Sequence, residues 1–220
     1  MLGNKNEKSG TLLILKPVSK VNGESVKPFF EISSKDKNEN KWVPSTDTSI
    51  NSISGSLFKI EAVEEEYKGD KYFRVKAIIK DGDEAYLIPF RMNIATRSLL
   101  NSFFHLESFE NLSIRYYLSK SGYDSYYVTQ NDEKVTWKFE SSELPAPEEI
   151  SFKGKIIRDF TKLDLFFVDQ IKILNERIKL NPAKSSEESE SKVSSSSFQA
   201  SDSSDSSEPE NWESEEEVPF

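Results

Sequence analysis

The sequence predicts a mainly β protein: a small closed barrel with one helix inserted between its strands. Three observations lead to this prediction. Residues 11–140 contain short segments of alternating apolar and polar side chains separated by turn signals. A single helical pattern, at 93–106, interrupts them. Five to seven strands with one such helix are typical of a Greek-key barrel rather than a two-sheet sandwich, and the chain has no internal repeat.

The expected elements follow the chain in order. The candidate strands, with a shorter one at 11–16, span residues 27–33, 56–66, 71–80, 84–91, 112–119, 123–129 and 134–139. Glycine-containing turns separate several of them, at 68–70, 81–83 and 121–122. The helix at 93–106 places Ile94, Leu99, Leu100, Phe103 and Phe104 on an apolar side.

A second helix is expected at 159–180, where apolar residues recur every three or four positions until Asn181 and Pro182 end the pattern. The prolines in 144–147 mark a boundary before it. We therefore expect a domain at 1–150, a helical segment at 151–182 and a tail at 183–220. The helix, which includes Phe160, Phe166 and Phe167, either packs on the barrel or forms a dimer seam. Packing on the barrel is the favoured alternative, and a homo-oligomer stays open.

The negative charge of the chain is confined to its end. The 220 residues have a net charge of −9, but the segment from Lys184 to Phe220 alone carries 11 acidic and 2 basic residues. The remaining 183 residues therefore hold 27 acidic and 27 basic side chains. Because the stretch 185–217 is mostly Ser, Glu and Asp, it has too little apolar surface to fold, and we expect it to be disordered. The folded part is neutral, so the total charge does not exclude a nucleic-acid partner.

Tyrosine and basic residues gather on the expected outward faces of two strands. In 71–79, Phe73, Val75, Ala77 and Ile79 form the apolar face, and the opposite face carries Tyr72, Arg74 and Lys76. In 112–118, Leu112, Ile114, Tyr116 and Leu118 are expected to point inward, and Arg115 and Tyr117 outward. In 123–129, one face carries Tyr123 and Tyr127 and the other carries Tyr126 and Val128, so that five of the eight tyrosines lie between 116 and 127. Aromatic rings stack on bases and cations meet phosphates, so such faces suit single-stranded nucleic acid. The alternative is that these residues are ordinary on exposed strands, since tyrosine has a high β-propensity.

We select the candidates for a DNA-binding face from these strands. The main set is Tyr72, Arg74, Lys76, Arg115, Tyr117 and Tyr127. The weaker candidates are Lys59, Arg91, Tyr123, Trp137 and Lys138. Trp137 and Lys138 are neighbours on the expected strand 134–139, so only one of them faces the DNA. The acidic run from Glu61 to Glu66 is expected to balance part of this basic charge.

The chain ends in NWESEEEVPF, an acidic tract closed by an apolar residue, proline and phenylalanine. A terminal phenylalanine offers a ring and a carboxylate together, which fits an apolar pocket beside a basic side chain on a partner. The expected partner-binding residues are Trp212, Glu215, Glu216, Glu217, Val218, Pro219 and Phe220.

This ending resembles the acidic tip of bacterial and phage single-stranded DNA-binding proteins, with Glu for Asp and Val for Ile. The body, over about residues 50–140, resembles the phage members with an OB fold. The matching stretches are SGSLFKIEAVEEEYKGDKYFRVKAIIKDGDEAYLIPF, ATRSLLNSFFHL and VTQNDEKVTWKF. The resemblance implies an OB-fold barrel that coats single-stranded DNA in replication, recombination or repair. Its tail would recruit replication or recombination proteins and compete with DNA for the basic groove.

No enzyme, cofactor or metal site is expected. The chain has no cysteine, and its one histidine, His105, is interpreted as a partly buried structural residue. No run approaches 18 apolar residues, so we expect no membrane span and a cytoplasmic protein, bacterial or in the host cytoplasm if phage-encoded. Two other functions stay open: an acidic protein-interaction or DNA-mimic module, and an RNA-binding OB protein.

Overall fold

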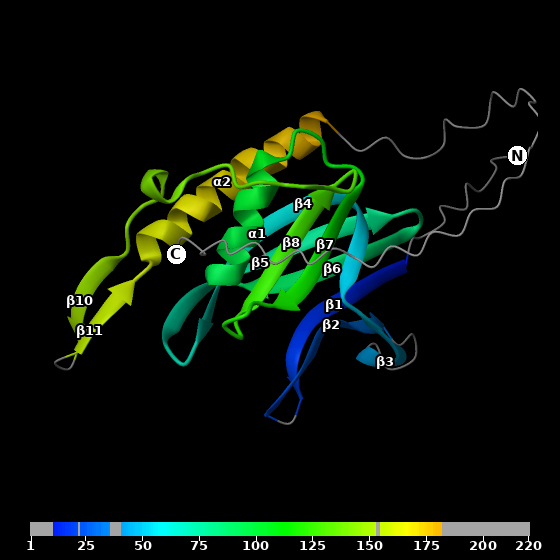
Figure 1. Ribbon diagram of the computed structural model, residues 1–220, viewed down its shortest axis with the longest axis horizontal. Coiled ribbons are helices and arrows are strands. Elements are labelled where there is room, and N and C mark those ends of the chain that lie inside the picture. Colours follow the sequence, from blue (N-terminus) through cyan, green and yellow to red (C-terminus); the bar gives the residue numbers. More distant parts are fainter. Residues whose placement is uncertain (1–10, 22, 36–40, 153–154, 182–220) are drawn as a thin grey trace, which may run out of the picture.

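The computed structural model describes residues 11–21, 23–35, 41–152 and 155–181. Within these ranges the protein is mainly β, as the sequence predicts (Figure 1). The first six strands are β1 (Thr11–Val21), β2 (Glu24–Lys35), β3 (Trp42–Ile50), β4 (Ser52–Tyr67), β5 (Asp70–Asp81) and β6 (Glu84–Arg91). Then follow α1 (Ile94–His105), β7 (Leu112–Leu118), β8 (Asp124–Gln130), β9 (Glu133–Lys134), a short 3-10 helix (Ser141–Glu143), β10 (Glu148–Phe152), β11 (Lys155–Asp159) and α2 (Thr161–Leu180).

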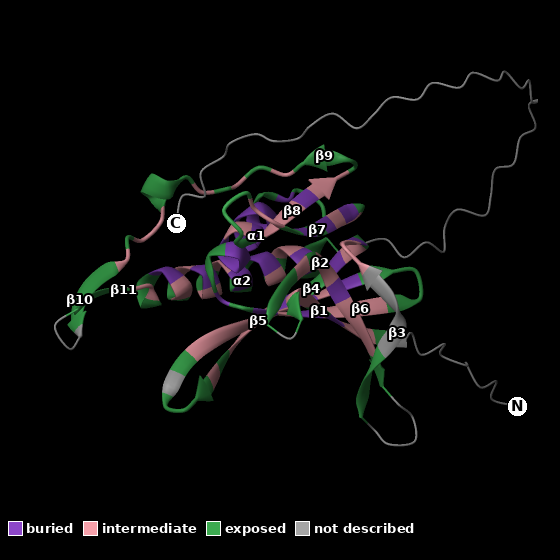
Figure 2. Cartoon of the chain, turned by 60° about the horizontal axis from the view of Figure 1, so that its bottom comes forward, coloured by how far each residue is buried: buried purple, intermediate pink, exposed green. Residues whose placement is uncertain are grey.

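Nine of these strands form one mixed sheet in the order β3-β2-β1-β6-β5-β4-β7-β8-β9. Strands β4, β5 and β6 make an antiparallel meander, and after α1 the β7–β8 hairpin returns to pair with β4. Only β1 and β6 run parallel among the described strands. The β10–β11 hairpin is a separate two-stranded sheet, which extends beyond one end of α2 in Figures 1 and 2.

Strand β4 pairs with β7 along its first residues and with β5 along the rest, and it bends between these two parts at Gly55. Residues Ser52–Gly55 pair with β7, and the strand from Ser56 onward pairs with β5. Gly55 has a φ of +146°, and a Cβ there would lie 2.4 Å from the carbonyl oxygen of Lys80. Only glycine fits so close to another strand in this conformation. A register shift between Leu57 and Lys59 completes the bend.

The core lies between the curved sheet and the two helices, as the buried segments in Figure 2 show. Of the expected inward residues of β5 and β7, Phe73 and Leu118 are half-buried and the others are buried; the buried ones are Val75, Ala77, Ile79, Leu112, Ile114 and Tyr116. Rings from distant strands meet inside: Phe30 of β2 contacts Tyr116 of β7, and Phe90 of β6 contacts Tyr126 of β8. The sheet therefore curls so that β2 and β6 approach β7 and β8 across the core.

Helix α2 shares this core. Its stripe of Leu163, Phe167, Ile171, Leu174 and Ile178 is buried in the same cluster as the strand residues. The helix contacts α1 and β4, so it packs on the sheet. This position agrees with the favoured alternative, packing on the barrel. The expected boundary at residue 150 falls inside β10.

Polar contacts hold the two helices together. Arg97 of α1 forms an ion pair of 2.7 Å with Asp164 of α2, and both side chains are mostly buried. At the other end, Arg177 of α2 donates to the carbonyl oxygens of Phe104 and Leu106, where α1 ends. Those carbonyls have no partner within α1, so Arg177 supplies their hydrogen bonds. None of the described helices is long and apolar enough to cross a membrane.

The expected strand 134–139 is wrong in extent, because β9 ends at Lys134. The chain beyond it follows α1 instead. The buried side chain of Asn101 donates to the carbonyl of Phe139 and accepts from its N–H, both at 2.9 Å. These hydrogen bonds replace those of a strand ladder. His105 also differs from expectation, because it is exposed, with Nδ1 3.1 Å from the carbonyl oxygen of Thr136.

Three strands were not expected from sequence. Strand β3 contains Pro44 and a run of Ser and Thr, so its apolar alternation is weak. Among the described strands it pairs only with β2, at the edge of the sheet. Strands β10 and β11 lie beside the prolines that were interpreted as a boundary.

The ends of other helices and strands differ from the expected ones by a few residues. Helix α1, for example, begins at Ile94 because the Asn93 side chain accepts a hydrogen bond from the N–H of Thr96 at 2.9 Å.

Candidate nucleic-acid interface

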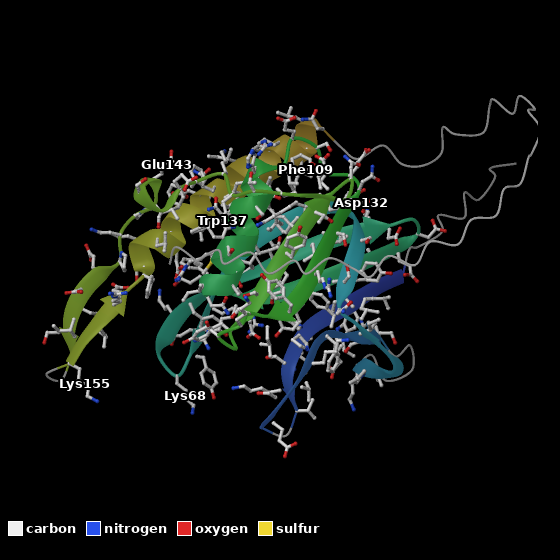
Figure 3. All side chains as sticks on the ribbon, in the orientation of Figure 1. Lys68, Phe109, Asp132, Trp137, Glu143 and Lys155 are labelled. Carbon is white, nitrogen blue, oxygen red and sulfur yellow. The ribbon has the colours of Figure 1, made fainter. Side chains whose placement is uncertain are left out.

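Five of the six main candidates selected from sequence fall into two groups at opposite ends of β4. The first, which we call the Tyr72 cluster, consists of Tyr72, Arg74 and Lys76 on β5 with Arg91 on β6 and Glu65 on β4. The second, which we call the Arg115 groove, lies over β4, β7 and β8. Figure 3 shows these strands with their side chains, and Lys68 at the tip of the β4–β5 hairpin.

Alternation along β5 places the Tyr72 cluster on the outside of the sheet. Val75 and Ala77 point into the core, so Tyr72, Arg74 and Lys76 point away from it. Strand register adds two neighbours, because Arg74 lies opposite Arg91 on one side, and Tyr72 lies opposite Glu65 on the other. The cluster therefore combines residues from three strands.

The ring of Tyr72 is in contact with two guanidinium groups. The guanidinium carbon of Arg91 lies 5.0 Å from the ring centroid, and that of Arg74 lies 6.0 Å from it. The Tyr72 hydroxyl donates to Glu65 Oε2 at 2.8 Å, and Arg74 Nε donates to the same oxygen at 2.8 Å. An aromatic ring beside cations can stack on a base while the cations contact phosphates.

Hydrogen bonds within this cluster shift two ionisation equilibria. The hydrogen bond from Arg74, followed by that from Tyr72, lowers the pKa of Glu65 below its ordinary value. The same bond to Glu65 raises the pKa of Arg74. At neutral pH the cluster therefore contains a carboxylate and a guanidinium in direct contact. The acidic run on β4 balances basic charge here, as expected, and Lys59 likewise forms an ion pair of 2.6 Å with Glu61.

The Arg115 groove is a shallow depression of about 300 Å³ on the outer surface. Its lining consists of Asn51, Ser52, Ser113, Arg115, Tyr127 and Thr129. Ser52, Arg115 and Tyr127 lie opposite one another in adjacent strands, and so form one row across β4, β7 and β8. The hydroxyls of Ser52 and Ser113 are 2.9 Å apart. Within the described residues Arg115 forms no ion pair, in contrast to Arg74.

The tyrosines of this region divide between the two faces as the alternation predicts. Tyr117 is 40 % exposed and Tyr123, in the turn before β8, is 73 % exposed. Tyr116 and Tyr126 point inward with their rings stacked 5.2 Å apart. The Tyr116 hydroxyl donates to Asp124 at 2.6 Å, and burial raises the pKa of both inward tyrosines. Only the outward tyrosines are available to stack on a ligand.

The last two strand candidates do not lie where the sequence argument placed them. Trp137 and Lys138 are outside any strand, so alternation does not decide which of them faces outward. Figure 3 shows Trp137 on the segment that follows β9, and the neighbouring backbone contacts Asn101 and His105 of α1. Lys138 is exposed, with its Nζ 5.1 Å from the ring of Phe139.

Sequence reasoning did not select the hydroxyl and amide residues of the groove or the role of Glu65. The groove residues are small polar side chains whose common location depends on which strands pair. Glu65 appeared only as part of an acidic run, although the turn at 68–70 could have suggested that it faces Tyr72 across a hairpin. Within the described ranges, no group of three His, Cys, Asp or Glu residues could hold a metal ion.

The expected partner-binding residues, from Trp212 to Phe220, lie outside the described residues. The expected tail at 183–220 lies outside them as well. No protein-family model, curated protein or solved structure matches the chain.

Proposed function

We propose that this chain is an OB-fold protein that binds single-stranded DNA without strong sequence preference and recruits replication, recombination or repair proteins through its C-terminal tip. The observation that carries the proposal is the outward ring of Tyr72 in contact with Arg91 and Arg74 on the faces of β5 and β6. A sequence-tolerant binding surface needs such rings and cations, because every base has a stacking face and every nucleotide a phosphate.

The connectivity supports the OB part of the proposal. A five-stranded OB barrel is a Greek key that binds oligonucleotides on its second and third strands and on the loops after its first and fourth. If β4, β5, β6, β7 and β8 are those five strands, the second and third are β5 and β6, which carry the Tyr72 cluster. The loop after the fourth strand contains the exposed Tyr123. Under this assignment, the Tyr72 cluster and Tyr123 would lie on the parts of an OB barrel that bind oligonucleotides.

The Arg115 groove supplies the second part of the proposed binding surface. Arg115 is a cation without a carboxylate partner among the described residues, and Tyr127 beside it supplies a ring. Serine and threonine hydroxyls next to them are ordinary donors to phosphate oxygens. DNA that contacts both groups would follow β4 from one end to the other.

Titration with labelled oligonucleotides tests the proposal. We expect the full chain to bind oligo-dT more tightly than a duplex of equal length, and the affinity to fall as salt rises. Arg91→Ala should weaken binding, while Lys172→Ala, which removes an exposed cation of α2 paired with Asp169, should not. Equal affinity for single and double strands would contradict the proposal. Competition with an RNA oligonucleotide distinguishes a DNA from an RNA protein, and absence of binding to either would favour the DNA-mimic alternative.

A further inference from the structure

Glu65 accepts hydrogen bonds from two of the side chains that are proposed to contact DNA. Its Oε2 atom accepts from the Tyr72 hydroxyl and from Arg74 Nε, each at 2.8 Å. Lys76 is close enough to stabilise the same negative charge. Two of the three main candidates on β5 therefore hydrogen-bond to this carboxylate, and the positive charge of the third, Lys76, also favours its ionised form.

The chemistry of this contact is that of anion recognition. Guanidinium N–H groups and phenolic hydroxyls are donors that proteins use on phosphate oxygens, and a carboxylate accepts from them in the same way. The side chains of Arg74 and Glu65 remain 35 % and 30 % exposed, so an incoming anion can reach them. A ligand anion can thus take the place of the Glu65 carboxylate at Arg74.

We propose that Glu65 is an internal substitute for phosphate, which occupies Arg74 and Tyr72 in the free protein and must be displaced by a polyanionic ligand. This inference rests on the proposed function and specifies how the surface discriminates among anions. A single phosphate competes poorly with a carboxylate that is held beside Arg74 at high effective concentration. A polymer that already contacts Arg91 or the Arg115 groove also presents its next phosphates to Arg74 at high effective concentration, and can therefore displace the Glu65 carboxylate.

The neighbouring Glu64 provides a matched control. It also forms an ion pair with a cation of β5, Lys71, at 2.8 Å, and it is exposed. Successive residues of a strand point to opposite faces, so Glu64 lies on the other side of β4. Glu64→Gln and Glu65→Gln change the net charge equally, and only the second removes the carboxylate from the Tyr72 cluster.

The test compares Glu65→Gln, Glu64→Gln, Arg74→Ala and the double variant Glu65→Gln/Arg74→Ala in the full chain, by anisotropy of labelled oligo-dT at low salt. We expect Glu65→Gln to bind about two to five times more tightly than Glu64→Gln, as for release of an exposed ion pair. Most of the gain should be lost in the Arg74→Ala background, because the guanidinium that Glu65 binds is then absent.

Three outcomes would overturn the inference: equal affinities of the two glutamine variants, a gain of the same size without Arg74, or weaker binding by Glu65→Gln. If the wild type binds no oligonucleotide, the proposed function fails, and sodium polyphosphate then decides the inference separately. Polyphosphate carries the anions without bases, so Glu65→Gln should still bind it more tightly than Glu64→Gln does. Urea unfolding of every variant identifies effects that arise from loss of the fold.

Discussion

Asn175 of α2 hydrogen-bonds to both backbone groups of Ile60 in β4. The N–H of Ile60 donates to Asn175 Oδ1 at 3.1 Å, and Asn175 Nδ2 donates to the carbonyl oxygen of Ile60. Strand β4 pairs with β5 along this stretch, whereas its pairing with β7 ends at Gly55. The amide therefore replaces a missing neighbouring strand, in a place where Ile60 is buried from water.

Replacement of Asn175 by leucine should reduce the free energy of unfolding by about 1–3 kcal/mol, because it leaves a buried N–H and C=O without partners. Urea unfolding monitored by circular dichroism measures this loss. Lys172→Ala, one turn earlier on an exposed side of the same helix, is the control and should change stability by less than about 0.5 kcal/mol. Equal stability of the two variants would show that water or a rearranged strand satisfies Ile60.

The buried pair of Arg97 and Asp164 predicts a pH effect of defined sign. Burial raises the pKa of Asp164 above its ordinary value, although Arg97 opposes the shift. Because the folded-state pKa is raised, the protonated form of Asp164 favours the fold. This contribution to stability is fully present below the unfolded-state pKa, about 3.9, and it is lost as pH rises through the folded-state pKa. We therefore expect wild type to lose stability relative to Asp164→Asn as pH rises above the unfolded-state pKa of about 3.9.

Unfolding midpoints of both proteins at pH values below and above this pKa measure the effect. Asp169→Asn, an exposed position on the same helix that is paired with Lys172, is the matched control. A relative gain of stability by wild type with rising pH would mean that attraction to Arg97 exceeds the cost of burial.

Tyr117 tests the outward face of β7. Replacement by alanine should weaken binding to oligo-dT by about 1–3 kcal/mol, as for loss of one stacked base. The same loss is expected for Tyr72→Ala, and binding isotherms at fixed salt measure both. Leu165→Ala, which removes an exposed apolar side chain of α2, should leave affinity unchanged. Unchanged affinity in both tyrosine variants would remove these residues from the binding surface.

Deletion of residues 184–220 tests competition by the tail. The deleted segment carries the whole net charge of −9, and a tethered polyanion competes with DNA for basic groups. We expect the truncated chain to bind oligo-dT more tightly at low salt, with the advantage shrinking as salt rises. A control variant keeps a tail of the same length but has uncharged residues in place of the acidic ones. It shows whether the negative charge of the tail or its size reduces DNA binding. Weaker binding after truncation would contradict the competition.

Local patterns were sufficient for much of the fold. Strand β6 was predicted at its observed bounds, and both helices were predicted within two residues of theirs. The alternation of β5 and β7 correctly assigned Val75, Ile114 and Tyr116 to the core, because side-chain direction in a strand depends only on position parity. Polar or proline-containing segments such as β3 and β10 lacked this pattern and were missed.

By itself, the sequence determined that the protein is mainly β, which residues face outward on β5 and β7, and that the negative charge lies after residue 183. Only the tertiary structure decided that Glu65 binds Arg74 and that Asn175 hydrogen-bonds to the edge of β4. It also decided that Ser52 lines one groove together with Arg115 and Tyr127. The physical reason is that side-chain direction is local to a strand. Register, the bend at Gly55 and the docking of α2 depend on contacts between residues far apart in the chain.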